Sequence, residues 1–264
     1  QPADWPLLAA DIRSRLLIAA LQPLHRRPYR VAIHGSEVSK LSRRSPFWSL
    51  VRAAYRRSVH VAANSQATLD LYHAAMQARG GYAHSRESVT YPGIAASAFQ
   101  IEDPAFDDPQ LAALPADATL ICAVGRIEAR KGQLHAVQAV ARARDAHGLA
   151  NPVLVLAGRL ETPDALAAVA TEASRLNIPL IAPGRVSDAD VRRLYQRSAC
   201  HLLLAQPEPG RIEGFGLVLL DAAAQFCPSV ATRVGGIPEA MGPTGVLVDP
   251  GDIDAAAVAI AAYA

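Results

Sequence analysis

The chain has 264 residues, 51% of them hydrophobic and 5% aromatic, which is long enough for one large or two modest domains. It contains no uncharged apolar run of about 18 residues and no basic segment followed by an apolar one, so neither a membrane-spanning helix nor a secretory signal is predicted. Residues 1–100 hold 13 Lys and Arg against 5 Asp and Glu, whereas residues 101–264 hold 13 against 19.

The first hundred residues show a short alternation of helices and strands. Because only three strands are predicted, too few for a sheet covered on both faces, we expect part of this domain to be absent from the chain or closed up within it. Helices are predicted at 5–21, 46–57 and 66–78, and strands at 29–34, 59–63 and 88–91.

The basic charge of this first part predicts an anionic partner, either a membrane surface or an acidic substrate, unless it is only an Arg-rich solvated surface. The helix predicted at 46–57 combines Trp48 and Tyr55 with three arginines. Basic and aromatic residues on one helix suit a membrane interface, although the aromatic side chains could instead pack inward.

After a linker rich in Pro, Asp and Ala, strands and helices alternate to the end of the chain, which predicts a parallel doubly wound sheet. The expected domains are therefore 1–99 and 118–264, joined by a linker at 100–117. Strands are predicted at 118–124, 152–157, 178–182, 200–204, 229–232 and 245–248, and helices at 133–146, 163–176, 188–198, 217–226 and 252–262.

Three cysteines, Cys122, Cys200 and Cys227, are odd in number and scattered. Two of them lie in apolar strand-like runs, so buried free thiols in a reducing compartment are expected rather than disulfides or a metal site. A cytoplasmic location follows, with peripheral contact at the inner face of the membrane as a further expectation from the basic first part.

The segment from Gly125 to Gly132 follows a predicted strand and opens a predicted helix. Ligands bind at the carboxyl ends of strands in doubly wound sheets, and the cations Arg126 and Lys131 there suit a diphosphate. The segment is neither a Walker loop nor a dinucleotide fingerprint. Standing alone it could equally be a solvated helix start.

A second segment places two carboxylates, Glu213 and Asp221, on either side of a Gly-Phe-Gly turn and an apolar run. If a helix opens after Gly216, its free N–H groups form an anion site, and Asp221 lies about one and a half turns into it. One loop could then hold a sugar, a phosphate and a ribose.

Eight segments, given below in chain order, together resemble family 4 retaining glycosyltransferases of the GT-B fold. This fold is an α/β architecture of two Rossmann-like doubly wound domains. The donor-domain likeness covers nearly all of 119–264, and the upstream part resembles the tail of an N-terminal domain that is only partly represented. The segments are AIHGSE, VAANSQATLDLY, VTYPGIAASAF, GRIEARKG, PGRVSDADVRRLY, RIEGFGLVLLD, VATRVGGIPEAM and TGVLVDPGD.

The resemblance implies roles for individual residues. Arg126 and Lys131 would bind the diphosphate, Glu213 would lie near the donor sugar hydroxyls, and His34 would reach the sugar and the reacting centre. Asp221 would hold the ribose hydroxyls. The remaining donor contacts would come from Gly125, from Gly214, Phe215, Gly216, Leu217 and Val218 around the turn, and from Arg185 and Val186 beside the nucleobase.

Three departures accompany the resemblance. Asp221 stands where the family has a longer Glu, and Phe226 stands where it commonly has a Gly before the next strand. The front of the N-terminal domain, with its Gly-rich loop, is not represented. Plainer interpretations also exist: His34 as a strand-end histidine, Glu213 as a surface charge and Glu239 as a helix N-terminal charge.

The implied activity is metal-independent hexosyl transfer, without a cofactor, from a UDP-, GDP- or ADP-sugar to a glycan, lipid-linked or small-molecule acceptor. No Asp-x-Asp metal motif is present, and nucleic acid is not an expected partner. Two alternatives remain: a sugar-nucleotide epimerase or phosphorylase of the same fold, and a non-catalytic subunit that binds the donor. Reaction with donor alone, or binding without transfer, would distinguish them.

Overall fold

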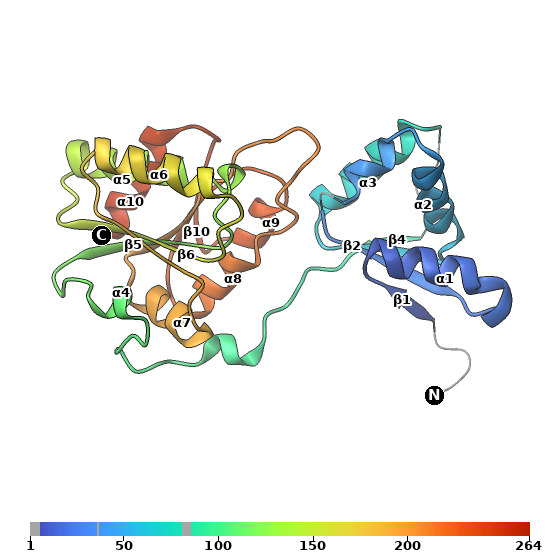
Figure 1. Ribbon diagram of the computed structural model, residues 1–264, viewed down its shortest axis with the longest axis horizontal. Coiled ribbons are helices and arrows are strands. Elements are labelled where there is room, and N and C mark those ends of the chain that lie inside the picture. The colour runs from blue at the N-terminus through green and yellow to red at the C-terminus, as the bar shows by residue number, and fades with distance from the viewer. Residues whose placement is uncertain (1–5, 36, 81–85) are drawn as a thin grey trace. The chain divides into compact units, whose positions relative to one another are not determined.

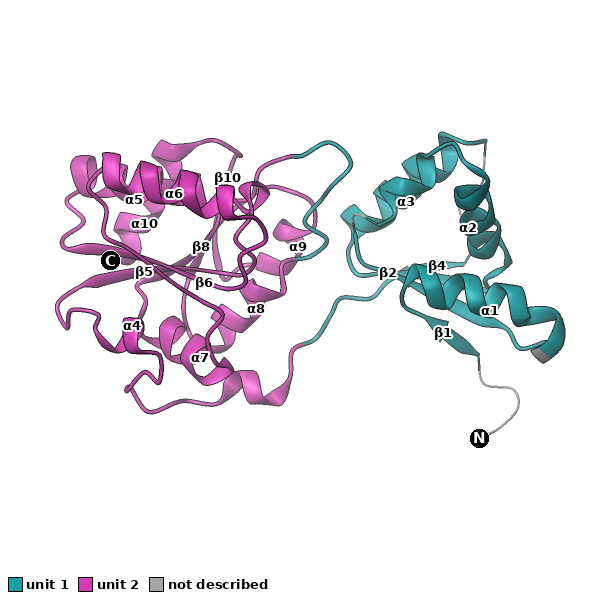
Figure 2. Ribbon diagram, in the orientation of Figure 1, with its two compact units in different colours: residues 1–93, 208–215 teal, residues 94–207, 216–264 magenta. Residues whose placement is uncertain are grey.

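The computed structural model describes residues 6–35, 37–80 and 86–264. The chain divides into two compact units, one formed by residues 1–93 and 208–215 and the other by residues 94–207 and 216–264 (Figure 2). Each unit contains one parallel β-sheet with helices packed against it. In the described part of the chain, no helix is long and apolar enough to cross a membrane.

The first unit has four parallel strands in the order β1-β2-β3-β4 (Figure 1). Strand–helix–strand crossovers are right-handed, so strands added in sequence place all the intervening helices on one face of the sheet. The strands are β1 (Leu7–Ala9), β2 (Tyr29–Ile33), β3 (His60–Ala63) and β4 (Glu87–Val89); the helices are α1 (Ile12–His25), η1 (Ser39–Ser42), α2 (Pro46–Arg57) and α3 (Gln66–Gln77).

Burial along the strands agrees with this one-sided packing. Tyr29, Val31 and Ile33 of β2 are fully buried against the helices, and the Tyr29 hydroxyl donates to the carbonyl of Ala54 in α2. On the opposite face, the side chains of Leu8 and Arg30 are exposed. The alternation expected of a half-covered sheet is thus present in a parallel one.

The prediction of a helix at 5–21 is wrong at its start, because residues 7–9 form β1 and α1 begins only at Ile12. Asp11 ends the strand and caps the helix, accepting hydrogen bonds from the N–H groups of Arg13 (2.8 Å) and Ser14 (3.0 Å). Over the described residues, the first sheet therefore has four strands rather than the predicted three.

Helix α2 packs Trp48, Tyr55 and part of its basic side chains inward, whereas its third aromatic residue, Phe47, is 49% exposed. Tyr55 is buried, Trp48 is half-buried, and Arg52 donates to the carbonyl oxygens of Leu41 (2.7 Å) and Arg43 (3.1 Å). For Trp48 and Tyr55 the structure therefore agrees with the expectation that the aromatic side chains pack inward.

The second unit is a doubly wound sheet of six parallel strands in the order β10-β9-β8-β5-β6-β7, as the alternation predicts. Figure 1 shows α5, α6 and α10 on one face and α4, α7 and α8 on the other. The strands are β5 (Thr119–Val124), β6 (Pro152–Ala157), β7 (Leu180–Gly184), β8 (Cys200–Leu203), β9 (Ser229–Thr232) and β10 (Gly245–Val248).

Two apolar clusters fill these faces. Ile121 and Ala123 of β5 belong to one, and Leu120 and Cys122 belong to the other, so alternate residues of a single strand supply both cores. The helices are α4 (Pro109–Ala112), α5 (Gln133–His147), α6 (Pro163–Arg175), α7 (Asp188–Arg197), α8 (Leu217–Ala224), α9 (Ile237–Met241) and α10 (Ile253–Tyr263), with short turns η2 (Ala96–Phe99) and η3 (Ala129–Lys131).

All three cysteines are free and buried in the second unit, as predicted. Burial raises the pKa of the Cys200 thiol well above its usual value, so this thiol stays protonated and unreactive.

The turn between α8 and β9 forms although Phe226 replaces the expected Gly. Phe226 adopts a left-handed backbone (φ 57°) with its side chain 87% exposed. Its N–H donates to Ala223, and that of Cys227 donates to the carbonyl of Ala222 (3.0 Å). The sequence thus keeps a helix ending that usually uses glycine.

Candidate functional site

The strand order of the second unit reverses between β5 and β8, and ligands of open α/β sheets bind at such a switch point, beyond the carboxyl ends of the strands. Residues 125–132, here called the cation loop, leave β5 at this point. Gly132 has φ 76°, and a Cβ there would lie 1.8 Å from the carbonyl oxygen of Leu204. The loop therefore lies directly against the end of β8.

A buried carboxylate organises the cation loop. Glu128 lies 3.3 Å from the Arg126 guanidinium and 3.0 Å from that of Arg130, and its own side chain is only 7% exposed. Arg126 remains half-exposed, and the Gln133 side chain donates to its carbonyl oxygen (2.9 Å). Glu128 thus pairs with Arg126 at the surface of the loop and with Arg130 in its interior.

Lys131 ends the short turn η3, where its N–H donates to the carbonyl of Glu128 (2.9 Å). Burial, with a contribution from the positive charge of Lys131, lowers the pKa of His201 in β8 to about 3. Lys131 therefore carries its charge close to β8, and His201 is neutral in the folded chain.

Helix α8 begins beside the same strand end. Gly216 precedes it with φ 95° and packs against Leu203 and Leu219. Within the described residues no side chain caps this helix start, so its first N–H groups and positive dipole end are available to an anion. The starts of α5 and α8 thus converge on the carboxyl end of β8, an arrangement that favours an anionic ligand.

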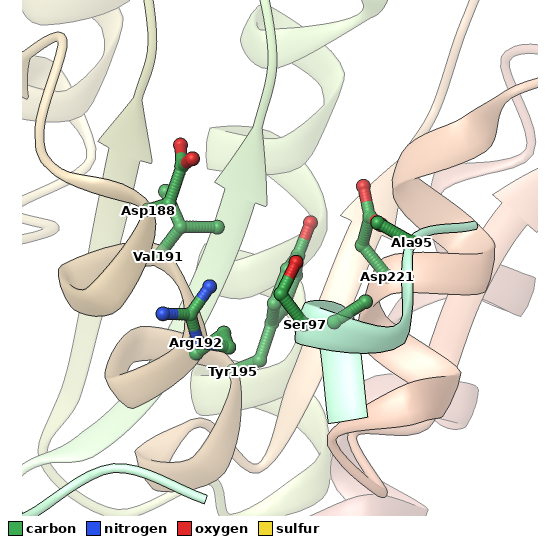
Figure 3. A pocket seen from close by; sticks show the side chains of 8 residues that line it. Ala95, Ser97, Asp188, Val191, Arg192, Tyr195 and Asp221 are labelled. Carbon is green, nitrogen blue, oxygen red and sulfur yellow. The ribbon is translucent and has the colours of Figure 1, made fainter. Parts of the chain in front are cut away.

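Asp221 lies one turn further along α8 and borders a cavity of about 240 Å³ (Figure 3). Burial, and then the nearby carboxylate of Asp188, raise the pKa of Asp221 above its usual value. Figure 3 shows Asp188 and Arg192 of α7 on one side of the cavity and Asp221 with Ala95 on the other. The lining also includes Ser97, Ala98, Val191 and Tyr195.

Sequence reasoning missed most of this lining. Arg192 is fixed by Glu102 of the linker (2.5 Å), and the Tyr195 hydroxyl donates to the carbonyl of Val218 in the first turn of α8 (3.3 Å). Tyr195 therefore ties α7 to the helix that carries Asp221. Arg185 and Val186, the expected nucleobase neighbours, lie between β7 and α7 and are not among the lining residues.

The other candidate residues lie in the first unit. His34 follows β2, its N–H donates to the carboxylate of Glu37 (2.6 Å), and its carbonyl accepts from the side chain of Asn64 (3.1 Å). Gly214 packs on that carbonyl, and Phe215 stacks on Tyr91 at 5.7 Å between ring centroids.

The structure therefore brings the candidate residues together as two groups. His34 lies with the segment Glu213–Phe215 in the first unit, although the sequence placed that segment within 118–264. In the second unit, Gly125, Arg126 and Lys131 follow β5, and Gly216, Leu217, Val218 and Asp221 belong to α8 and its start.

The family model described as "Glycosyl transferases group 1" matches residues 118–264, which is more than half of the chain. The chain belongs to this family. Its match begins at β5 and so includes the cation loop, α7 and α8.

Curated relatives include a glycosyltransferase and a glycogen synthase. The D-inositol 3-phosphate glycosyltransferase of Acidothermus cellulolyticus is 31% identical over 212 residues, 77% of this chain and 44% of the relative. The glycogen synthase of Mycobacterium tuberculosis (strain H37Rv) is 33% identical over 139 residues, 52% of this chain and 32% of the relative. The chain thus spans less than half the length of these curated relatives.

Solved structures share the fold. Anabaena HepE in complex with UDP and glucose superposes with a TM-score of 0.74 at 21% identity, covering 97% of this chain and 67% of that one. Sucrose-phosphate synthase from Thermosynechococcus elongatus gives a TM-score of 0.70 at 22% identity, covering 98% and 66%. The predicted α/β GT-B fold is confirmed by these neighbours.

Proposed function

We propose that this chain acts in a retaining glycosyltransferase that moves a hexosyl unit from a UDP-, GDP- or ADP-sugar to a glycan, lipid-linked or small-molecule acceptor. The observation that carries the proposal is the meeting of the cation loop and the start of α8 at the exit of β8. Two relatives with glycosyl-transfer names, and a neighbour solved with UDP and glucose, support this choice of donor.

In this proposal different residues of the second unit bind different parts of the donor. Arg126, Lys131 and the N–H groups of Leu217 and Val218 stabilise the departing diphosphate, whose negative charge grows in the transition state. The bond from the anomeric carbon to the diphosphate breaks, a bond to the acceptor oxygen forms, and the acceptor proton passes to the departing phosphate. Asp221 holds the ribose, while Gly125, Arg185 and Val186 border the phosphates and the base.

The residues of the first unit would act on the sugar. Glu213 would accept hydrogen bonds from donor hydroxyls, with the backbones of Gly214, Phe215 and Gly216 as its cradle, and His34 would approach the reacting centre. Asp221, which stands where the family has a longer Glu, motivates the rival proposal of a donor-binding subunit without turnover.

A thermal-shift panel tests the donor assignment. UDP, GDP, ADP and their sugars are each added to the chain, and the matching nucleotide should raise the melting temperature, because a ligand that binds only the folded state stabilises it. Lys131→Ala should abolish the shift. A panel in which no nucleotide shifts the melting temperature would contradict the proposal.

We also propose that the reaction needs no metal, because two cations and a helix start can replace a divalent ion at the diphosphate. Activity should survive EDTA unchanged. Loss of activity that Mn²⁺ restores would show the opposite.

Peripheral membrane contact is proposed for the outer faces of α1 and α2. Leu17 (61% exposed), Leu24 (82%) and Leu50 (64%) project from these helices beside the exposed Arg13 and Arg57. Apolar and basic side chains on a helix surface favour anionic lipid. Sedimentation with vesicles that contain phosphatidylglycerol should exceed that with phosphatidylcholine alone, and Leu17→Ser with Leu24→Ser should remove the difference.

A further inference from the structure

Residues 208–215, here called the glutamate loop because they carry Glu213, pack on the carboxyl edge of the first sheet. The Ser39 hydroxyl donates to the carbonyl of Gly210 (2.6 Å) near the start of the loop. Phe215 stacks on Tyr91 at the end of the loop, with the two rings 26° apart. Both ends of the loop are therefore attached within the first unit.

The closest approach lies beside Glu213 itself. A Cβ at Gly214 would lie 2.0 Å from the carbonyl oxygen of His34, and a Cβ at Gly35 would lie 3.1 Å from the Cα of Gly214. Gly214 does not have a left-handed backbone, so glycine is required there for space rather than for conformation. The two backbones are in direct contact at this point.

Two polar side chains complete the contact. Asn64, which is 91% buried, donates through Nδ2 to the His34 carbonyl (3.1 Å), and that nitrogen is also 3.1 Å from the Cβ position of Gly214. Thr68 is fully buried, and its Oγ1 lies 3.5 Å from the carbonyl oxygen of Gly214. Its own N–H is bound by Ser65, which caps α3, so Thr68 has a fixed position.

Asn64 also carries an unusual cost. Its Oδ1 is buried without a hydrogen-bond partner in the described part of the chain. A buried oxygen in that state is destabilising, and an apolar residue would avoid the cost. The Nδ2 of the same amide donates to His34, on whose carbonyl Gly214 packs, so the side chain is tied to these two neighbours.

We propose that Asn64 and Thr68 are positioning residues for the glutamate loop: Thr68 acts through the Gly214 carbonyl and Asn64 through the His34 carbonyl on which Gly214 packs, and together they set the place of the Glu213 carboxylate against the donor sugar. The inference rests on the proposed function for what Glu213 binds. Displacement of a substrate-contacting group by about 1 Å can cost about 10²-fold, so such support is functionally significant.

The experiment compares four variants of the chain. Asn64→Ala and Thr68→Val each remove one contact, Thr68→Ser keeps the hydroxyl, and Ser58→Ala is the matched control. Ser58 is buried in the same unit and donates to the carbonyl of Tyr55 (2.7 Å), but it precedes β3, whereas Asn64 follows it.

Calorimetry measures binding of three pairs of probes: UDP and UDP-glucose, GDP and GDP-mannose, and ADP and ADP-glucose. With the pair that binds, Asn64→Ala and Thr68→Val should weaken the nucleotide-sugar about tenfold, the worth of one hydrogen bond, and leave the free nucleotide within about twofold. Thr68→Ser and Ser58→Ala should bind both like the wild type. Equal weakening of sugar and nucleotide, or none, overturns the positioning role.

Amide hydrogen exchange gives a readout that needs no ligand. Exchange in a peptide covering 208–218 should quicken in Asn64→Ala and Thr68→Val but not in Ser58→Ala, and peptides from β8 should be unchanged in all variants. Unchanged exchange in 208–218 would refute the inference. If the wild type binds none of the six probes, the proposed function fails, while this exchange measurement still decides the positioning role.

Discussion

The two segments that flank the exit of β8 in the second unit are held in different ways. The cation loop is fixed by charge, because the buried Glu128 pairs with both Arg126 and Arg130. Helix α8 is fixed by backbone conformation, with Gly216 at φ 95° before it and Phe226 at φ 57° after it. Its one carboxylate, Asp221, has no ion pair in the described chain and faces a second carboxylate, Asp188.

The difference teaches what each segment can contribute. Paired charges keep cations in place until an anion arrives, so the cation loop carries the electrostatics. A helix start with free N–H groups supplies directed dipoles that need no counter-charge. Substitutions in the cation loop should therefore change the turnover rate and the stability that its ion pairs provide. Substitutions in α8 should change stability, through the strain of its backbone and the burial of its carboxylate.

The largest effect is expected at the cations themselves. Arg126→Ala and Lys131→Ala should each slow turnover about 10²–10³-fold, about 3–4 kcal/mol, because under the proposed function each removes a charge that stabilises the leaving diphosphate. Arg142→Ala, which removes an exposed arginine paired with Asp254 (2.6 Å), is the control and should be neutral. If steady-state kinetics gave either variant a turnover rate within about threefold of wild type, the proposed electrostatic role of the loop would be wrong.

Next comes the carboxylate that fixes the loop. Glu128→Gln should lower the free energy of unfolding by about 2–4 kcal/mol in urea titrations, because it removes a buried negative charge that lies 3.0 Å from the buried Arg130. Glu161→Gln, which removes a half-exposed partner of Arg159 (2.8 Å) and a more distant partner of Arg126 (3.9 Å), should cost less than about 1 kcal/mol. If the two variants lost the same free energy of unfolding, burial would not explain the stabilising effect of Glu128.

On the α8 side, backbone strain should be removable. Phe226→Gly is expected to raise the free energy of unfolding by about 1 kcal/mol, because glycine adopts the left-handed conformation without steric cost. Phe226→Ala keeps that cost and loses only an exposed ring, so it should stay within about 0.5 kcal/mol of wild type. A gain in the alanine variant as large as that in the glycine variant would point to the ring instead.

The smallest effect concerns the charge of Asp221. Its pKa is raised in the folded chain by burial and by Asp188, so ionisation costs stability above that pKa and costs nothing below the ordinary value of 3.8. Asp221→Asn should therefore raise the melting temperature at pH 7, and the gain should vanish as the pH falls to about 3. A gain independent of pH would show that the charge is not its source.

The sequence predicted the second unit closely because apolar strands alternate there with capped helices, as at Ser187, whose hydroxyl accepts from the N–H of Asp190. It failed at β1, where Leu7-Leu8-Ala9 also fits a helix and only the cap at Asp11 separates the two. Three-residue strands carry too short a pattern for periodicity to identify them.

The candidate site was predictable where one segment contains the whole signal, as in the cation loop. The cavity lining was not, because Arg192 and Tyr195 follow ordinary helical spacing and nothing local shows that they face Asp221 rather than solvent or the core. The packing of Gly214 near Thr68 joins residues 146 positions apart, and a single sequence does not report contacts at that distance.

The three buried thiols have a practical consequence. All of them lie in the second unit, whereas both tryptophans of the sequence, Trp5 and Trp48, fall within residues 1–93. A thiol-reactive dye added to the native chain therefore times the opening of the second unit, while the emission of Trp48, which packs against the core of the first unit, follows that unit. Thiol labelling and tryptophan emission can therefore be followed in the same sample, to test whether the two units unfold together without an engineered label.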